Sequence, residues 1–127
     1  MTTQNKIPNF WGGCELKSSL TLEALAEILS REIFSGAKFG GKEKSIHEEI
    51  PAVFIESSFL GMLVVLEGYS DNWFVLSIKP YGKFNRFLSV NEVETERVDL
   101  DMYLYYLLKQ SLLNYSEILV IEPKNQE

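Results

Sequence analysis

The pattern of apolar and polar residues along the chain predicts secondary structure most clearly between residues 51 and 80. Residues 52–56 and 73–78 are rich in branched and aromatic side chains, and residues 62–66 are apolar without a break. Such runs are typical of β-strands, and a strand that lacks polar alternation is typically covered on both faces. A Ser-Asp-Asn cluster at 70–72 has the side chains that stabilise turns. We therefore predict a three-stranded antiparallel meander, with the second run at its centre.

A helix is predicted upstream of this meander, over residues 22–35. Leucine and isoleucine recur there at steps of three and four residues, which is the period of an amphipathic helix. Thr21 suits the position before the first turn, and Gly36 suits the left-handed residue that ends many helices. A short strand is predicted over residues 14–18. Before it, residues 1–9 are expected to be flexible, and the aromatic pair Phe10-Trp11 is followed by two glycines that are expected to form a flexible joint.

In the second half of the chain the sequence signals for secondary structure are weaker. Residues 83–90 are interpreted as a shorter strand, and a second helix is predicted over residues 100–113, with Asp99 or Asp101 as its cap. This helix is apolar on nearly every side, so it is buried or shared with another chain. A last strand over residues 117–122 and a flexible tail over residues 123–127 follow.

Together these elements predict an α+β fold in the order β-α-β-β-β-(β)-α-β, as one domain over residues 1–127. The sheet is expected to be mostly antiparallel, with two helices packed on one face. The length of 127 residues suits a single domain, and 46% apolar residues exclude a wholly disordered chain.

The net charge of the chain limits the kinds of molecule that it is expected to bind. The formal net charge is −6, which argues against binding to a nucleic-acid backbone, since that needs clustered Lys and Arg. Cys14 is the only cysteine, so no disulfide can form within the chain. The first residues lack the apolar core of a secretion signal, and no run reaches the ~18 apolar residues of a membrane span. We expect a cytoplasmic protein that binds neither nucleic acid nor membrane.

One string resembles a phosphate-binding loop. Residues Gly36–Lys42 match the first seven positions of the P-loop, but that motif follows a strand, opens a helix and ends in Ser or Thr. Here the string follows the predicted helix, and Glu43 occupies the eighth position. A turn-forming loop is the favoured interpretation. A small ligand- or nucleotide-binding protein, or an enzyme that uses this loop near His47, remains the alternative.

Other catalytic or metal-binding signals are weak. His47 is the only histidine, and neither a zinc-protease nor a paired-cysteine motif is present. Cys14 and His47 have the chemistry of a nucleophile and its base, but the sequence does not place them together. We expect no cofactor, no metal and no catalytic residues, and therefore not an enzyme.

The acidic residues near the second predicted helix carry more information. Five acids surround one base, Arg97; they are Glu92, Glu94, Glu96, Asp99 and Asp101. In an extended chain the three glutamates project from one face. Two explanations are open: an edge strand that resists mispairing, or a strip that docks on a basic protein. Trp73 and Tyr81 are candidate aromatic anchors beside such a strip.

The order of elements resembles that of small acidic immunity proteins from bacterial toxin systems, including contact-dependent growth inhibition. The similarity covers residues 15–122, through TLEALAEILSREI, EIPAVFIE, LGMLVVLEGY and WFVLSIKP, then the acidic segment and a last helix and strand. The resemblance implies an inhibitor that covers the active site of a cognate toxin, often a basic nuclease, and has no catalytic residues of its own. A homodimer formed through the second helix or the edge of the meander is a further possibility.

Overall fold

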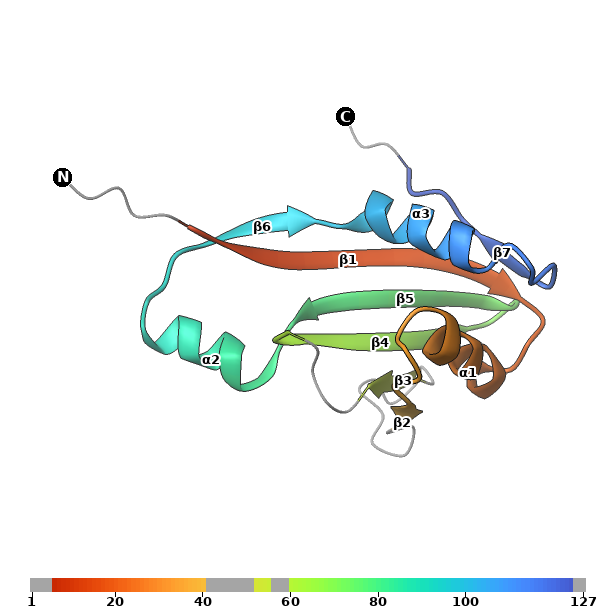
Figure 1. The fold of residues 1–127 in the computed structure, drawn as a ribbon, viewed down its shortest axis with the longest axis horizontal. Helices are drawn as coiled ribbons and strands as arrows, with labels where there is room; N and C mark the ends of the chain where they lie inside the picture. Colours follow the sequence, from red (N-terminus) through yellow and green to blue (C-terminus); the bar gives the residue numbers. More distant parts are fainter. Residues whose placement is uncertain (1–5, 41–51, 56–59, 125–127) are drawn as a thin grey trace.

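The computed structural model describes residues 6–40, 52–55 and 60–124, and these form an α+β fold as predicted (Figure 1). The elements are β1 (Ile7–Ser18), α1 (Leu22–Glu32), β2 (Phe39–Gly40), β3 (Ala52–Ile55), β4 (Met62–Tyr69), β5 (Trp73–Pro80), α2 (Gly82–Val90), β6 (Thr95–Asp99), α3 (Asp101–Ser111) and β7 (Ile118–Val120).

The strands form one mostly antiparallel sheet in the order β2-β3-β4-β5-β1-β6, and β7 also pairs with β1. β1 pairs antiparallel with β5 on one side. On its other side it pairs parallel with β6 over its first half and antiparallel with β7 over its last three residues. β1 therefore joins the meander to the C-terminal elements.

The predicted meander is confirmed. β3, β4 and β5 pair antiparallel in sequence order, with β4 between the other two. Ser70, Asp71 and Asn72 connect β4 to β5, and the last two have positive φ angles, 62° and 61°. Asp and Asn tolerate this left-handed geometry, which suits them to a tight hairpin connection. The four consecutive residues 63–66 of β4 are buried, in agreement with a strand at the centre of the meander.

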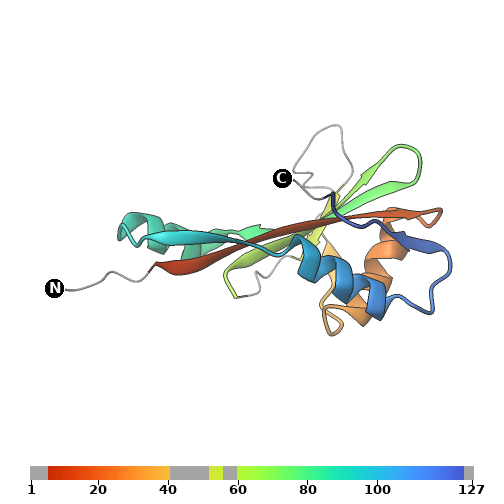
Figure 2. The same cartoon turned by 90° about the horizontal axis from the view of Figure 1, so that it is seen from above.

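α1 and α3 lie on the same face of the sheet, which confirms the predicted packing of two helices (Figure 2). The core between them is made of leucines without measurable exposure: Leu16, Leu25, Leu29, Leu66, Leu76 and Leu108. Thr21 caps α1 as predicted, since its Oγ1 accepts a hydrogen bond from the backbone N–H of Ala24 at 3.1 Å. Gly36 is left-handed as predicted, although the helix itself ends earlier, at Glu32.

The predicted flexibility is wrong for residues 7–9, and so is the predicted joint at residues 12 and 13, because β1 is continuous from Ile7 to Ser18. Residues 1–5 lie outside the described residues. Residues 7–11 pair with β6, and this long-range partner was not visible in the sequence. Gly12 has a packing role. A Cβ there would lie 3.0 Å from Leu104 Cδ1 and 3.1 Å from Leu100 Cβ, so the glycine allows α3 to approach β1 closely.

The prediction of a strand over residues 83–90 is also wrong, because Gly82–Val90 forms a helix, α2, in addition to the two predicted helices. Phe84, Phe87 and Leu88 are spaced by three and four residues, which is a helical period. Only Leu88 of this helix is buried. Two strands are absent from the predicted order of elements: β2, within the Gly36–Lys42 string, and β6, before α3. The other differences are boundaries: α3 spans Asp101–Ser111 and β7 spans Ile118–Val120.

Candidate protein-binding surfaces

The five acids of the segment 92–101 divide among three local structures. Glu92 lies in the turn after α2 with a positive φ of 53°, and Glu94 precedes β6. Glu96 and Asp99 lie in β6, and Asp101 begins α3. The extended run predicted for all three glutamates therefore fails at Glu92.

β6 is the last strand of the sheet path among the described residues, so this segment is an edge strand, a position that suits both explanations of its acids. Ile7 N–H donates to the carbonyl of Glu94 at 3.1 Å, and Leu100 N–H donates to the carbonyl of Trp11 at 2.7 Å. Backbone groups alternate in direction along a strand, so the even-numbered residues of β6 face β1. The N–H and C=O groups of Thr95, Arg97 and Asp99 therefore point away from the sheet.

The side chains of β6 alternate between the two faces of the sheet. Glu96 is opposite Pro8, on the face that α1 and α3 cover elsewhere, and Arg97 projects from the other face. The Arg97 guanidinium lies 4.6 Å from the centroid of the Trp11 ring, a cation–π contact. The side chains of Glu92, Glu94 and Glu96 are exposed, and none of them forms an ion pair with another described residue.

Asp99 and Asp101 have structural roles at the junction of β6 and α3. Asp101 Oδ1 accepts a hydrogen bond from the backbone N–H of Gly13 at 2.8 Å. Asp99 Oδ1 accepts one from the backbone N–H of Asp101, also at 2.8 Å, so Asp99 satisfies the first N–H of α3. Burial raises the pKa of the Asp101 carboxyl above its ordinary value. Asp99 is exposed, whereas Asp101 is half-buried.

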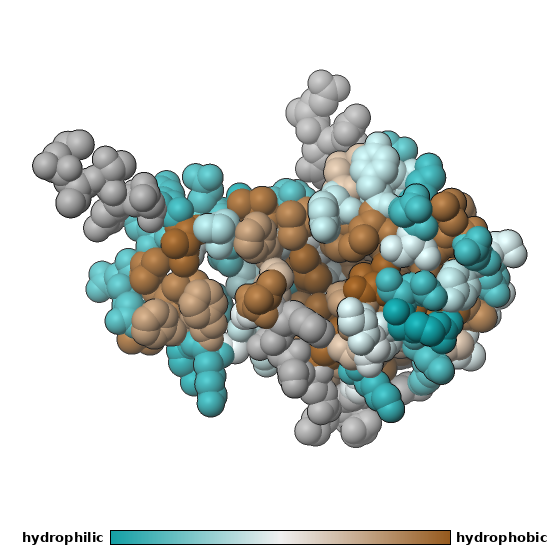
Figure 3. Space-filling view, in the orientation of Figure 1, coloured by the Kyte–Doolittle hydropathy of each residue, from teal (hydrophilic) through white to brown (hydrophobic). Residues whose placement is uncertain are grey.

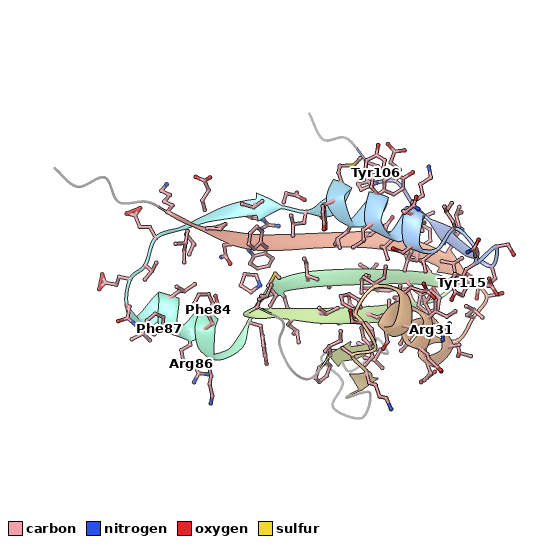
Figure 4. The ribbon with its side chains drawn as sticks, in the orientation of Figure 1. Arg31, Phe84, Arg86, Phe87, Tyr106 and Tyr115 are labelled. Atoms are coloured by element: carbon pink, nitrogen blue, oxygen red, sulfur yellow. The ribbon has the colours of Figure 1, made fainter. Side chains whose placement is uncertain are left out.

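α3 extends the acidic edge with aromatic side chains. Leu104, Tyr105 and Leu108 are buried against the sheet, whereas Tyr103 and Tyr106 are exposed. In Figure 4 Tyr106 points away from the sheet, on the side of the molecule where β6 also lies. We define the edge surface by five exposed residues of β6, of the segment before it and of α3: Glu94, Glu96, Asp99, Tyr103 and Tyr106.

The structure does not bring Trp73 and Tyr81 to the edge surface. Trp73 begins β5 and is half-buried, with Lys17 Nζ 5.2 Å from its ring centroid. Tyr81 follows the opposite end of β5 and is exposed. A strand of eight residues is about 25 Å long, so these two side chains lie far apart. β1 also separates β5 from β6.

The sequence interpretation missed a second, apolar surface around α2. Phe84, Phe87 and Val90 are 51%, 56% and 72% exposed, and Leu60 is 91% exposed. A hollow of about 340 Å³ lies between α2 and the first residues of β1 and β4. Figure 3 shows the apolar side chains gathered at this end of the molecule. The available signal was the three-residue spacing of Phe84, Phe87 and Val90.

The structure also bears on the candidate nucleophile Cys14 and on the candidate phosphate-binding string Gly36–Lys42. The Cys14 thiol is buried, and burial raises its pKa to about 11, so it is protonated at neutral pH. In the described part of the Gly36–Lys42 string, Phe39–Gly40 forms a strand, whereas a P-loop opens a helix. Gly41, Lys42 and His47 lie outside the described residues.

Across residues 6–40, 52–55 and 60–124 no three His, Cys, Asp or Glu side chains come together as a metal site. No helix in those ranges has the length and apolar character needed to cross a membrane. No family model and no curated protein matches the sequence.

Proposed function

We propose that this protein is a binding protein that inhibits a basic protein partner through the edge surface. The observation that carries the proposal is the pair of exposed glutamates in this surface, Glu94 and Glu96, which have no ion-pair partner among the described residues. Neighbouring like charges repel one another, so this pair does not favour folding. A basic partner would supply the missing positive charge.

The overall charge supports the same class of partner. A net charge of −6 attracts a basic protein over several ångströms and accelerates its association. The glutamates would then select basic surfaces, and Tyr103 and Tyr106 would contribute apolar contact area near them. Tyrosine is enriched among the residues that dominate binding energy at interfaces.

The resemblance to immunity proteins suggests a toxin as the partner. A nuclease toxin has a basic surface for nucleic-acid phosphates, and the exposed carboxylates of the edge surface are suited to occupy it. We therefore propose that the protein acts in the cytoplasm and blocks the substrate-binding surface of a cognate toxin. This mechanism requires no bond-making step in the protein itself.

The test begins with affinity capture at low salt from the native organism, followed by identification of the bound protein. The activity of that protein is then titrated with the wild type and with the Glu94→Lys/Glu96→Lys variant. We expect stoichiometric inhibition by the wild type and a loss of about tenfold or more in potency for the variant. Glu27→Lys/Glu117→Lys is the control, because it makes the same charge change at exposed positions elsewhere.

Two results would contradict the proposal. One is a captured partner that is acidic, or whose binding does not weaken as salt increases, because charge attraction is screened by salt. The other is an equal loss of inhibition for the edge variant and its control, which would show that only net charge matters. A capture without inhibition would retain the binding role and reject the inhibitory one.

A further inference from the structure

α2 is a helix whose apolar face lies open. It buries only Leu88 among its nine residues, while Phe84, Phe87 and Val90 are exposed. Isolated helices shorter than about 12 residues are marginal in water, so such a helix depends on packing. Next to it, a Cβ at Gly61 would lie 2.8 Å from Phe84 Cδ2, so the turn that carries the exposed Leu60 packs directly against the helix.

The charges at the two ends of α2 are opposite to those that stabilise a helix. Lys83 lies in the first turn, where the helix is positive, and that turn contains no acid. Tyr81 at the cap position makes no side-chain hydrogen bond to the helix. Glu92 follows the last turn, where the helix is negative. Lys83, Phe87 and Val90 share one face, because they are spaced by four and three residues.

We propose that two copies of the protein associate through antiparallel α2 helices. An antiparallel partner brings its Glu92 to the positive end of the helix and to Lys83, which corrects both unfavourable charges at once. With Phe87 near the twofold axis, Phe84 meets Val90 of the second copy and Lys83 comes within reach of its Glu92. Every contact then occurs twice, as a symmetric dimer requires.

The placement of α2 keeps the proposed dimer contact away from the α3 part of the edge surface, with Tyr103 and Tyr106. α2 lies at the end of the molecule remote from α3 in both ribbon views (Figures 1 and 2). The two-ended charge pattern is complementary to itself only when the helices run in opposite directions. A second copy is therefore favoured over an unrelated apolar partner. This inference does not depend on the proposed function.

Sedimentation velocity of the full chain, from about 1 μM to about 1 mM, tests the dimer. We expect the wild type to dimerise in this range and Phe87→Ser to weaken the dimer at least about tenfold. Leu60→Ser should also weaken it, and this side chain is so exposed that its change leaves folding intact. Tyr106→Ser, on the edge surface, is the matched control and should have no effect.

The charges provide the sharper test of the antiparallel orientation. Lys83→Glu and Glu92→Lys should each weaken the dimer about threefold or more, and the double variant should regain most of that loss. Lys83→Glu should meanwhile increase the thermal stability of the monomer, because an acid suits the first turn of a helix. A chain that stays monomeric, a dimer insensitive to Phe87→Ser and Leu60→Ser, or a double variant as weak as the singles would overturn the inference.

Discussion

The carboxylate of Asp101 accepts a hydrogen bond from the backbone N–H of Gly13, at 2.8 Å and across 88 residues of sequence. This bond fixes the first turn of α3 to the middle of β1, next to the point where Gly12 lets the helix approach closely. The same junction ends β6, so it determines how the acids of that strand and the tyrosines of α3 lie relative to each other. The edge surface depends on this contact.

Substitution of Asp101 should show how strongly the junction holds the fold. Asp101→Ala removes the acceptor of the partly buried Gly13 N–H, and we expect a loss of about 1–3 kcal/mol in the free energy of unfolding. Asp101→Asn keeps an oxygen in place, so its loss should be clearly smaller. Urea unfolding at pH 7 measures both. Equal losses would show that the carboxylate charge, and not the hydrogen bond, matters.

The raised pKa of Asp101 makes a prediction about pH. Burial is its main cause, and the charge of Asp99 adds to it, while the hydrogen bond from Gly13 opposes it. The native state therefore keeps this proton at pH values above 3.8, where the unfolded state has released it. Stability contributed by this group then falls as pH rises through that window. On acidification toward 3.8, the wild type should gain stability relative to Asp101→Asn; a relative loss would contradict the direction of the shift.

Gly12 and Gly13 form a matched pair for the packing of α3. An alanine Cβ at Gly12 would lie 3.0 Å from Leu104 Cδ1, so Gly12→Ala should destabilise the fold by about 1–3 kcal/mol. At Gly13 the nearest atom would be 3.6 Å away, an ordinary contact distance. Gly13→Ala should be neutral or stabilising by up to about 1 kcal/mol. Thermal unfolding of the two variants decides, and similar losses for both would contradict the proposed close approach.

The free edge of β6 can be tested with proline. Thr95 N–H points away from β1, so Thr95→Pro should cost less than about 1 kcal/mol, as proline is tolerated at such edge positions. Glu96 N–H faces β1, so Glu96→Pro should cost about 3 kcal/mol by breaking the ladder. The difference in urea midpoint between the variants measures the register. A larger loss for Thr95→Pro would reverse the assigned direction of the backbone groups.

The parts of the fold that the sequence predicted correctly are those that local pattern determines. The leucine period and Thr21 specify α1, and the apolar run of β4 with the Asp71-Asn72 turn specifies the meander. The first half of β1 was missed because its partner, β6, lies more than 80 residues away in sequence. Two adjacent glycines suggest a joint locally, but the packing of α3 explains the first of them.

α2 shows why the candidate surfaces were only partly predictable. Phe84, Phe87 and Val90 are residue types that favour strands, whereas their three-residue spacing is that of the helix they form. An edge strand was one of the two interpretations of Glu94 and Glu96, and they lie beside and in β6, whereas Asp99, a candidate helix cap, ends β6. Trp73 and Tyr81 were predicted beside these acids because aromatic residues often anchor protein interfaces. Their separation follows from the strand order, in which β1 intervenes.

The most direct test of the central claim, an acidic edge that binds a basic protein, is one comparison of dissociation constants. The captured partner is titrated, at a single ionic strength, with the wild type, Glu94→Lys/Glu96→Lys and the control Glu27→Lys/Glu117→Lys. We predict that the edge variant binds about tenfold or more weakly than the control, with unchanged thermal stability. Equal affinities of the two variants, or a large loss of stability confined to the edge variant, would contradict the claim.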